Sequence, residues 1–170
     1  VKGARSFNGK IAGTPANFQP TNVIAFPLPK DYRANIADQK LKVNSDLKDQ
    51  PVEQLFVKGN KGEVVFPNGK STQITFSADQ PFTARSLTIY PSENAGAFNV
   101  TLEVLKDGEF NAIRTYRVDR TNPAENVGFD AFAPAAISFK AVESSTYRIT
   151  IDQTYGQAGV REIELRTIPV

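Results

Sequence analysis

Short runs in which apolar and polar residues alternate are the feature that most limits what this chain can fold into. The clearest run is FNVTLEVL at 98–105. Its apolar residues, all on one face of an extended strand, are Phe98, Val100, Leu102 and Val104. Successive side chains of a β-strand point to opposite faces, so such a run buries one face and leaves the other to solvent.

Further runs of this kind follow one another from about residue 52, with turn-forming residues between them. The runs are VEQLFVK (52–58), GEVVFP (62–67), STQITFS (71–77), RSLTIY (85–90), AIRTYRV (112–118), AISFK (136–140), TYRITI (146–151) and VREIELRTI (160–168). The residues expected to face the core include Ile74, Phe76, Leu87, Ile89, Tyr147, Ile149, Ile151, Ile163 and Leu165. Period two repeated in short strands predicts an all-β fold, either an antiparallel sandwich or a barrel.

Turn and helix signals agree with an all-β fold. Asp107-Gly108 predicts a tight hairpin after the 98–105 run, because this pair accepts the positive φ angles that such turns need. Helix is expected to be scarce. One helix beginning near Ser45 or Asp46 would be limited by Pro51.

The length and composition describe an ordinary single domain. With 170 residues, we expect an irregular lead-in over 1–20 and a single β-sandwich domain over 21–170. The sequence has no Cys and no His, which excludes disulfides, thiol chemistry, Ser-His-Asp triads and ordinary zinc sites. A net charge of +2 and the lack of a long apolar run argue against nucleic-acid and membrane partners.

The segment VIAFPLP at 23–29 combines strong hydrophobicity with two prolines. Proline lacks the N–H donor of a β-ladder and is confined to sheet edges, strand ends and bulges. We therefore expect this segment to lie across the outside of the sandwich, with its first residues packed inward. Pro27 and Pro29 would keep another chain from pairing there.

Two stretches of the sequence resemble galactose-binding-like, or discoidin-like, jelly rolls. LEVLKDGEFNAI (102–113) is similar to a strand-turn-strand of those domains, with Leu105 at the usual Ser position and Phe110 near the usual aromatic residue. TYRITIDQTYGQAGVREIEL (146–165) is similar to their penultimate strand, loop and final strand. The resemblance implies an antiparallel β-sandwich of the galactose-binding-like jelly-roll type.

The order of VIAFPLPKDY (23–32), ITFSADQPFTARSLTIYP (74–91) and the Asp-Gly hairpin resembles a β-domain of bacterial α-L-rhamnosidases of the glycoside hydrolase family 106 type. This resemblance implies an accessory, non-catalytic domain whose partner is the catalytic domain of the parent polypeptide. It also implies a periplasmic or extracellular location and contact with plant-type polysaccharide. A catalytic barrel of eight βα units is not present in these short strands.

Sugar binding uses an aromatic platform with a few planar polar groups. The chain has no Trp, and the best-placed aromatic residues are Tyr90, at the end of a strand before Pro91, and Tyr155, in the loop before Gly156. Arg161 is the expected donor to sugar hydroxyls. Arg114 and Arg148 are alternatives, although all three arginines also fit a solvated outer strand face.

Domains of the galactose-binding-like type often hold a structural calcium ion, so the resemblance implies such an ion here. Calcium takes six to eight oxygen ligands. Glu162 matches the position of the last-strand carboxylate, and Asp46 lies in the early loop region. A surface ion pair with an arginine is the alternative role for Glu162.

Carboxylates are the remaining acid-base groups of this chain. Glu103, Glu109, Glu162 and Glu164 are the candidates for a glycosidase pair. Glu162 and Glu164 share one strand face at i, i+2, which is typical of a solvated face, so we expect no catalysis. Three functions stay open: an accessory domain of an α-L-rhamnosidase, an autonomous carbohydrate-binding module, and a structural or adhesion domain that binds protein.

Overall fold

The computed structural model describes residues 34–93, 96–121 and 133–170, so the expected lead-in and the VIAFPLP segment lie outside the described residues. The element order is η1 (Ile36–Asp38), β1 (Leu41–Ser45), η2 (Val52–Phe56), β2 (Val64–Val65), β3 (Thr72–Pro91), β4 (Gly96–Lys106), β5 (Glu109–Asp119), β6 (Ala135–Gly156) and β7 (Gly159–Arg166), where η marks a 3-10 helix. Every strand pairing is antiparallel. No described helix is long and apolar enough to span a membrane.

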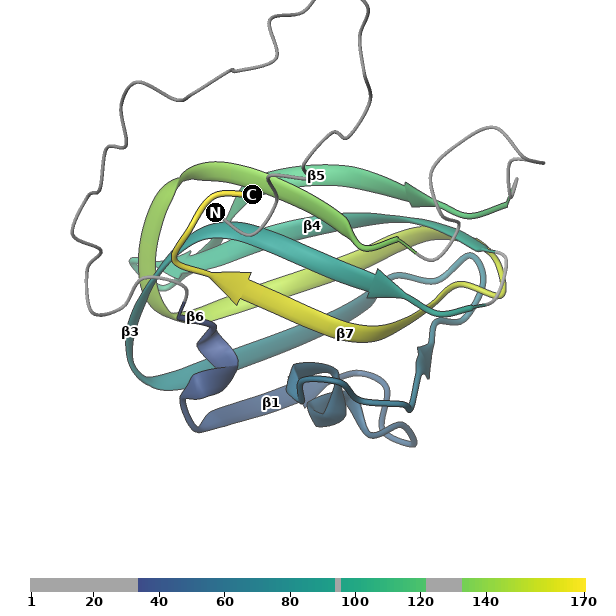
Figure 1. Cartoon of the computed structure of the whole chain (residues 1–170), viewed down its shortest axis with the longest axis horizontal. Helices are drawn as coiled ribbons and strands as arrows, with labels where there is room; N and C mark the ends of the chain where they lie inside the picture. Colours follow the sequence, from purple (N-terminus) through teal and green to yellow (C-terminus); the bar gives the residue numbers. More distant parts are fainter. Residues whose placement is uncertain (1–33, 94–95, 122–132) are drawn as a thin grey trace, which may run out of the picture.

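Two long strands, β3 and β6, bend together and connect the two layers of a β-sandwich (Figure 1). The first layer has the order β1-β3-β6-β4-β5 and uses the first half of β3 and the second half of β6. The second layer has the order β6-β3-β7-β2 and uses the other halves. The register of β3 on β6 shifts between Ser77 and Phe82, where the strand passes from one layer to the other. The predicted all-β antiparallel sandwich is confirmed.

Two pairs of runs expected as separate strands are continuous in the structure. The runs 71–77 and 85–90 belong to β3, and the runs 136–140 and 146–151 belong to β6. Polar residues interrupt the alternation between the runs of each pair. The backbones nevertheless keep their pairing through most of the bend, because β3 and β6 bend side by side.

The segments before β3 also differ from the expectation. β1 pairs with the first half of β3, although no strand is predicted there. The run 52–58, predicted as a strand, instead forms η2 directly after Pro51. The helix expected near Ser45 thus begins only after the proline. Val52 and Leu55 lie one 3-10 turn apart, so η2 buries both residues on one face.

The inward residues predicted for the alternating runs of β3, β4, β6 and β7 lie in the core between the layers. Those at most 7 % exposed are Ile74, Phe76, Leu87, Ile89, Phe98, Val100, Leu102, Val104, Tyr147, Ile149, Ile151, Ile163 and Leu165. Tyr147 is fully buried. Its hydroxyl oxygen lies 2.5 Å from the carbonyl oxygen of Phe82 and 3.0 Å from the carbonyl oxygen of Val142, so its single O–H is shared between two acceptors. This hydroxyl therefore connects the bend of β3 to the bend of β6. Burial raises the pKa of Tyr147 to about 12.

The predicted hairpin joins β4 and β5. Asp107 and Gly108 have φ angles of 54° and 84°, the left-handed conformations of a tight two-residue turn. Lys106 and Glu109 pair directly across this turn. The hairpin prediction is confirmed.

The two lateral sides of the sandwich are covered differently. On the closed side, between β1 and β7, the helices η1 and η2 pack against the strands and bury Ile36, Leu55 and Phe56. The open side lies between β5 and the first half of β6. Among the described residues no element covers it, and Ile113 and Phe139 stay half-buried there.

Candidate functional site

The loops between strands gather at one end of the sandwich, called the loop end. Thr72 pairs with Ile151 and Ile89 pairs with Ala135, so both long strands begin and end together there. The opposite end, called the bend end, holds the bends of β3 and β6 and the β4-β5 hairpin. In Figure 1 the loop end lies to the right.

Tyr155 is an exposed aromatic residue at the loop end, with 68 % of its surface accessible. It lies within β6, one residue before the strand ends, rather than in the predicted loop, and it pairs with Ala97 of β4. The register of these strands shifts just before this pair, and Gln153 has a φ of 48° within the shift. Thr154 is buried and donates to the carbonyl oxygen of Pro67 at 2.7 Å, whereas the next residue, Tyr155, is left in solvent. An exposed ring of this kind is available for stacking.

Four polar side chains of β4, β5 and β6 lie at register positions close to that of Tyr155. Together with Tyr155 they form the Tyr155 cluster: Asn99, Arg117, Asp119 and Gln153. Asn99 Nδ2 donates to Gln153 Oε1 at 2.8 Å, and Arg117 Nη1 donates to Asn99 Oδ1 at 3.5 Å. Arg117 Nε donates to Asp119 Oδ2 at 3.3 Å. Ala97 pairs with both Tyr155 and Asp119, so the ring and the carboxylate flank one small residue.

Asp119 supplies the negative charge of the cluster. Hydrogen bonds from the hydroxyl of Thr121 at 2.7 Å and from its backbone N–H at 3.0 Å hold the pKa of Asp119 below its ordinary value. The cluster therefore combines an ionised carboxylate, two amides and a guanidinium with one exposed aromatic ring. These planar donors and acceptors are suited to pairs of hydroxyl groups.

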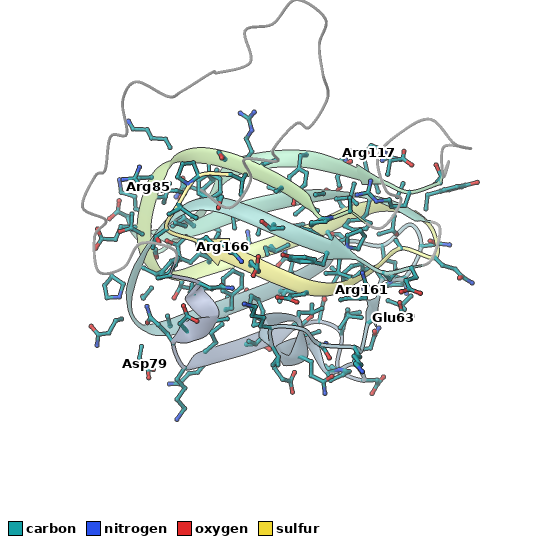
Figure 2. The ribbon with its side chains drawn as sticks, viewed as in Figure 1. Glu63, Asp79, Arg85, Arg117, Arg161 and Arg166 are labelled. Carbon is teal, nitrogen blue, oxygen red and sulfur yellow. The ribbon has the colours of Figure 1, made fainter. Side chains whose placement is uncertain are left out.

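Arg161 borders a shallow cavity of about 450 Å³ at the same end of the molecule. The cavity is lined by Lys61, Gly62, Glu63, Glu93 and Arg161. Arg161 Nε donates to the carbonyl oxygen of Pro91 at 3.1 Å, and its Nη1 lies 3.4 Å from Glu93 Oε1. Arg117, Arg161 and Glu63 are labelled toward the right of Figure 2. The predicted residues Tyr155 and Arg161 thus both lie at the loop end, on different layers.

Tyr90 is placed differently from Tyr155. Both tyrosines are the penultimate residues of their strands, but the hydroxyl of Tyr90 is engaged within the protein and donates to Glu164 Oε2 at 3.0 Å. Burial and the neighbouring Glu164 carboxylate raise the pKa of Tyr90 to about 12. Glu164 also pairs with Arg166 at 2.5 Å and is only 3 % exposed. The expectation of a solvated face at Glu164 is wrong, because this strand face is covered.

Arg148, the alternative donor to sugar hydroxyls, is engaged within the protein. Its Nε and Nη2 donate to the two oxygens of Glu103 at 2.8 and 2.6 Å, and the guanidinium lies 4.0 Å from the centre of the Phe110 ring. Thr150 also donates to Glu103 at 2.7 Å. The Arg148 pair holds the pKa of Glu103 below its ordinary value. Arg114 is exposed on β5, away from the loop end.

The two residues expected to bind calcium accept hydrogen bonds from different backbone groups. Asp46 accepts from the N–H of Gln73 at 3.2 and 3.3 Å, and Glu162 Oε2 accepts from the N–H of Gly59 at 2.9 Å. Within the described residues, no three acidic side chains are grouped to hold a metal ion. These side chains do not form a shared ligand set, and calcium stays a prediction. Instead of an arginine, Glu162 binds the loop before β2.

Several members of the Tyr155 cluster were not identified from the sequence. Asn99, Arg117 and Gln153 come from β4, β5 and β6, and the pair Asn99–Gln153 is separated by 54 residues. Each residue occupies an ordinary polar position of an alternating strand. Only the placement of Asn99 at the start of a strand, near the loops, hints at a site.

Comparison with known proteins shows the fold. No protein-family model matches the sequence, and no curated protein matches it. The module CpGH89CBM32-5 of Clostridium perfringens, solved with GalNAc-β-1,3-galactose, has a TM-score of 0.58 at 13 % identity and covers 74 % of this chain and 94 % of its own. The family 32 module of C. perfringens NanJ, solved with galactose, has a TM-score of 0.59 at 12 % identity. The match covers 79 % of this chain and 97 % of the module. A pectin-binding module has a TM-score of 0.56 at 11 % identity, and the match covers 75 % of this chain and 91 % of the module. The predicted galactose-binding-like sandwich is thus confirmed as a fold.

Proposed function

We propose that this chain is a non-catalytic carbohydrate-binding domain that holds glycan on the Tyr155 cluster. The observation that carries the proposal is a 68 % exposed tyrosine beside hydrogen-bonded amide, guanidinium and carboxylate groups. The likeness in fold to modules described as binding galactose, GalNAc-β-1,3-galactose and pectin supports it.

The chemistry of the cluster suits a sugar ring. A pyranose has an apolar face of C–H groups that stacks on an aromatic ring, and hydroxyl groups at its edge. With the ring on Tyr155, the edge hydroxyls would face Gln153 and Asn99 on one side and Asp119 on the other. Few polar groups with fixed positions are enough to orient such a ligand.

The carboxylates of the chain support a binding role rather than hydrolysis. Glycoside hydrolysis needs two carboxyl groups that face the scissile bond. Glu103 is held by Arg148, Glu164 by Tyr90 and Arg166, and Glu162 by a backbone N–H. These three side chains act as structural acceptors in the protein.

The finer proposal is that the domain belongs to a secreted bacterial α-L-rhamnosidase. It rests on the order of VIAFPLP, ITFSADQPFTARSLTIYP and the Asp-Gly hairpin. In that setting the partner would be the catalytic domain of the parent polypeptide, in the periplasm or outside the cell, acting on plant-type polysaccharide. The domain would then bring the catalytic domain to its substrate or shape the substrate cleft.

A calorimetric titration tests the binding proposal. The 170-residue chain is titrated with oligosaccharides that contain galactose, galacturonate or rhamnose, with calcium and with chelator. We expect one glycan to bind, and Tyr155→Ala to weaken its affinity by about five- to 150-fold, because a stacked ring contributes about 1–3 kcal/mol to binding. Arg161→Ala tests in the same way whether the predicted donor Arg161, on the other layer at the same end, also contributes to glycan binding.

A matched variant controls for general surface effects. Val57→Ala shortens another exposed apolar side chain, one that lies outside the cluster, and should leave the affinity unchanged. Equal affinities for wild type and Tyr155→Ala would reject this cluster as the platform. Failure of every glycan to bind would favour the protein-binding or purely scaffolding alternatives.

A further inference from the structure

The open side of the sandwich contains a groove of about 710 Å³ near the bend end. Its walls come from residues 111–114 of β5 and 139–143 of β6, and Val104 and Lys106 of β4 complete its lining. A volume of this size lies in the usual range for sites that bind small ligands. The groove shares no residue with the Tyr155 cluster and is therefore a separate feature.

The apolar part of the lining is continuous with the core. Val104 is buried, and Ile113, Phe139 and Val142 are half-buried and pack against the core. Among the described residues no element covers these side chains, so part of this apolar surface reaches solvent. The C–H face of a sugar ring or the apolar side chains of a peptide can pack on such a surface. The walls of the groove decide between these two kinds of ligand.

Each wall of the groove contains an irregularity of the strand pairing. On β5, Ile113 has no partner in the register with β4, because the pairing passes directly from Ala112 to Arg114. On β6, residues 139–141 lie opposite Arg85 of β3 alone. Such bulges change the direction of side chains and interrupt regular pairing. A peptide that adds to a sheet as a strand needs a regular edge, so the bulges disfavour a peptide strand as the ligand.

Three cationic side chains line the groove, one from each of its strands: Lys106 of β4, Arg114 of β5 and Lys140 of β6. None of them forms an ion pair within the described part of the chain, whereas four arginines elsewhere in the molecule each pair with a carboxylate. Glu143 is the single acidic residue among the described residues of the lining, so the net charge of the groove is +2. Unpaired cations beside an apolar surface favour a ligand with several anionic groups.

The length of the groove indicates a chain of several units rather than a single anion. The β6 wall is five residues long, which is roughly 17 Å of extended strand. In an oligosaccharide of uronic acids, each ring has an apolar C–H face and a carboxylate at its edge. A carboxylate can accept two parallel hydrogen bonds from the guanidinium of Arg114. The hydroxyl groups of the rings match the amide of Asn111 and the carboxylate of Glu143, which also line the groove.

We propose that this groove is a second glycan site, which binds an acidic oligosaccharide whose sugar rings carry carboxylates. The rings would pack on Phe139 and its apolar neighbours, and the carboxylates would pair with Lys106, Arg114 and Lys140. The proposal rests on the proposed function for its general ligand class, carbohydrate. Its residues are separate from the Tyr155 cluster, so the two sites can be tested independently.

Calorimetric titration of the full 170-residue chain with a galacturonate tetramer tests the groove. The titration is made on wild type and on Tyr155→Ala, in which binding at the cluster no longer contributes. A neutral galactose tetramer is the comparison ligand. We expect the acidic tetramer to bind Tyr155→Ala, and the neutral tetramer to bind it at least about tenfold more weakly, because it offers no carboxylate to the three cations.

Removing the positive charges of the groove should weaken the binding of the acidic tetramer. Lys106→Gln, Arg114→Gln and Lys140→Gln each replace an exposed cation by a neutral side chain, so we expect the fold to be retained. Each variant should lose about two- to fivefold in affinity, as for a solvent-exposed charge pair. The variant with all three substitutions, called the groove triple, should lose at least about tenfold.

A second variant with three substitutions controls for the overall change in net charge. It combines Lys42→Gln, Lys48→Gln and Lys70→Gln, three exposed lysines that do not line the groove. At the same salt concentration it should keep the affinity of wild type within about twofold, because charges outside the groove act on the ligand only through solvent.

Phe139→Ala separates a fitted sugar site from general attraction between charges. It removes apolar surface from the groove without changing any charge, and it should weaken the binding of the acidic tetramer about fivefold. Thermal unfolding without ligand checks that this variant is folded. The variants of the three cations provide the test if it is not.

Several outcomes would overturn the proposal. Equal affinities for the groove triple and the control variant would reject the groove as the site. Equal affinities for the acidic and the neutral tetramer, or tighter binding of a sulfated tetramer, would reject carboxylated sugars as the ligand. Loss of binding in Tyr155→Ala alone would assign the acidic ligand to the cluster and reject the groove, whereas loss in the groove triple alone would support the groove and reject the cluster.

Discussion

Two tyrosines of β6, Tyr147 and Tyr155, lie at opposite ends of the sandwich and differ in solvent exposure. Tyr147 at the bend end is fully buried and binds two backbone carbonyls. Tyr155 at the loop end is 68 % exposed. Eight residues separate them, so strict alternation would place both on the same face. The register shift at Gln153 changes the face, and the strand that stabilises the core at one end presents a ring to solvent at the other.

The difference teaches how stability and function are separated in this fold. At the bend end, the continuous strands β3 and β6 connect the two layers, so few loops are present there whose side chains could change without affecting the core. At the loop end, bulges and turns re-aim side chains without disturbing the core. Substitutions at the bend end should therefore alter the free energy of unfolding, and substitutions at the loop end should alter binding.

Tyr147→Ala should have the largest effect on stability. It leaves a cavity in the core and removes the hydroxyl that connects the two bends, so we expect a loss of about 3–5 kcal/mol in the free energy of unfolding. Urea denaturation followed by circular dichroism measures this loss. Tyr147→Phe keeps the ring and should cost only about 1 kcal/mol. A loss below about 1 kcal/mol for Tyr147→Ala would contradict the importance of the bend contact.

Breaking the ion pair between Glu103 of β4 and Arg148 of β6 should have an intermediate, pH-dependent effect on the free energy of unfolding. The pKa of Glu103 is lower in the folded chain than its ordinary value, so the carboxylate stabilises the fold at neutral pH. This contribution is lost as pH falls below the ordinary glutamate range near 4.3. Glu103→Gln should therefore destabilise the chain by about 1 kcal/mol at pH 7 and by less at pH 3.

The effect of Asp119 at the loop end on the pH dependence of stability can be compared with that of Glu103. Its pKa is also lowered, but its side chain is 47 % exposed, so solvent weakens its interactions. Asp119→Asn should change the pH dependence of stability less than Glu103→Gln does. Denaturation series at pH 7, 5 and 3 decide this order, and a larger change for Asp119→Asn would reverse the comparison of the two ends.

Tyr155→Ala should have the smallest effect on stability. An exposed ring without buried contacts contributes little to folding, and we expect a change within about 0.5 kcal/mol. The same variant should lose glycan affinity, which separates binding from folding in one residue. Thermal unfolding of the variant without ligand makes this measurement. A loss above about 1 kcal/mol would show that the ring supports the fold and is not simply presented to solvent.

Alternation predicted most of the strand residues of β3 to β7 and the side chains that face the core there, although it missed β1 and took the run 52–58 for a strand. Phe98, Leu102 and Tyr147 are buried as their period-two positions predict, because a pleated strand with one buried face needs no other information. The Asp107-Gly108 hairpin was equally predictable from the sequence, since its positive φ angles depend on two adjacent residues. These are local properties, and a sequence carries them directly.

Only the tertiary structure decided which distant segments meet. The continuity of β3 through its bend depends on its pairing with β6, and the burial of Glu164 depends on Tyr90 and Arg166. The Tyr155 cluster likewise joins three strands through one bulge. A shift of one residue in register moves every side chain to the other face, and register is set by packing between segments far apart in the chain. The candidate site was therefore predictable in its aromatic residue and not in the polar groups around it.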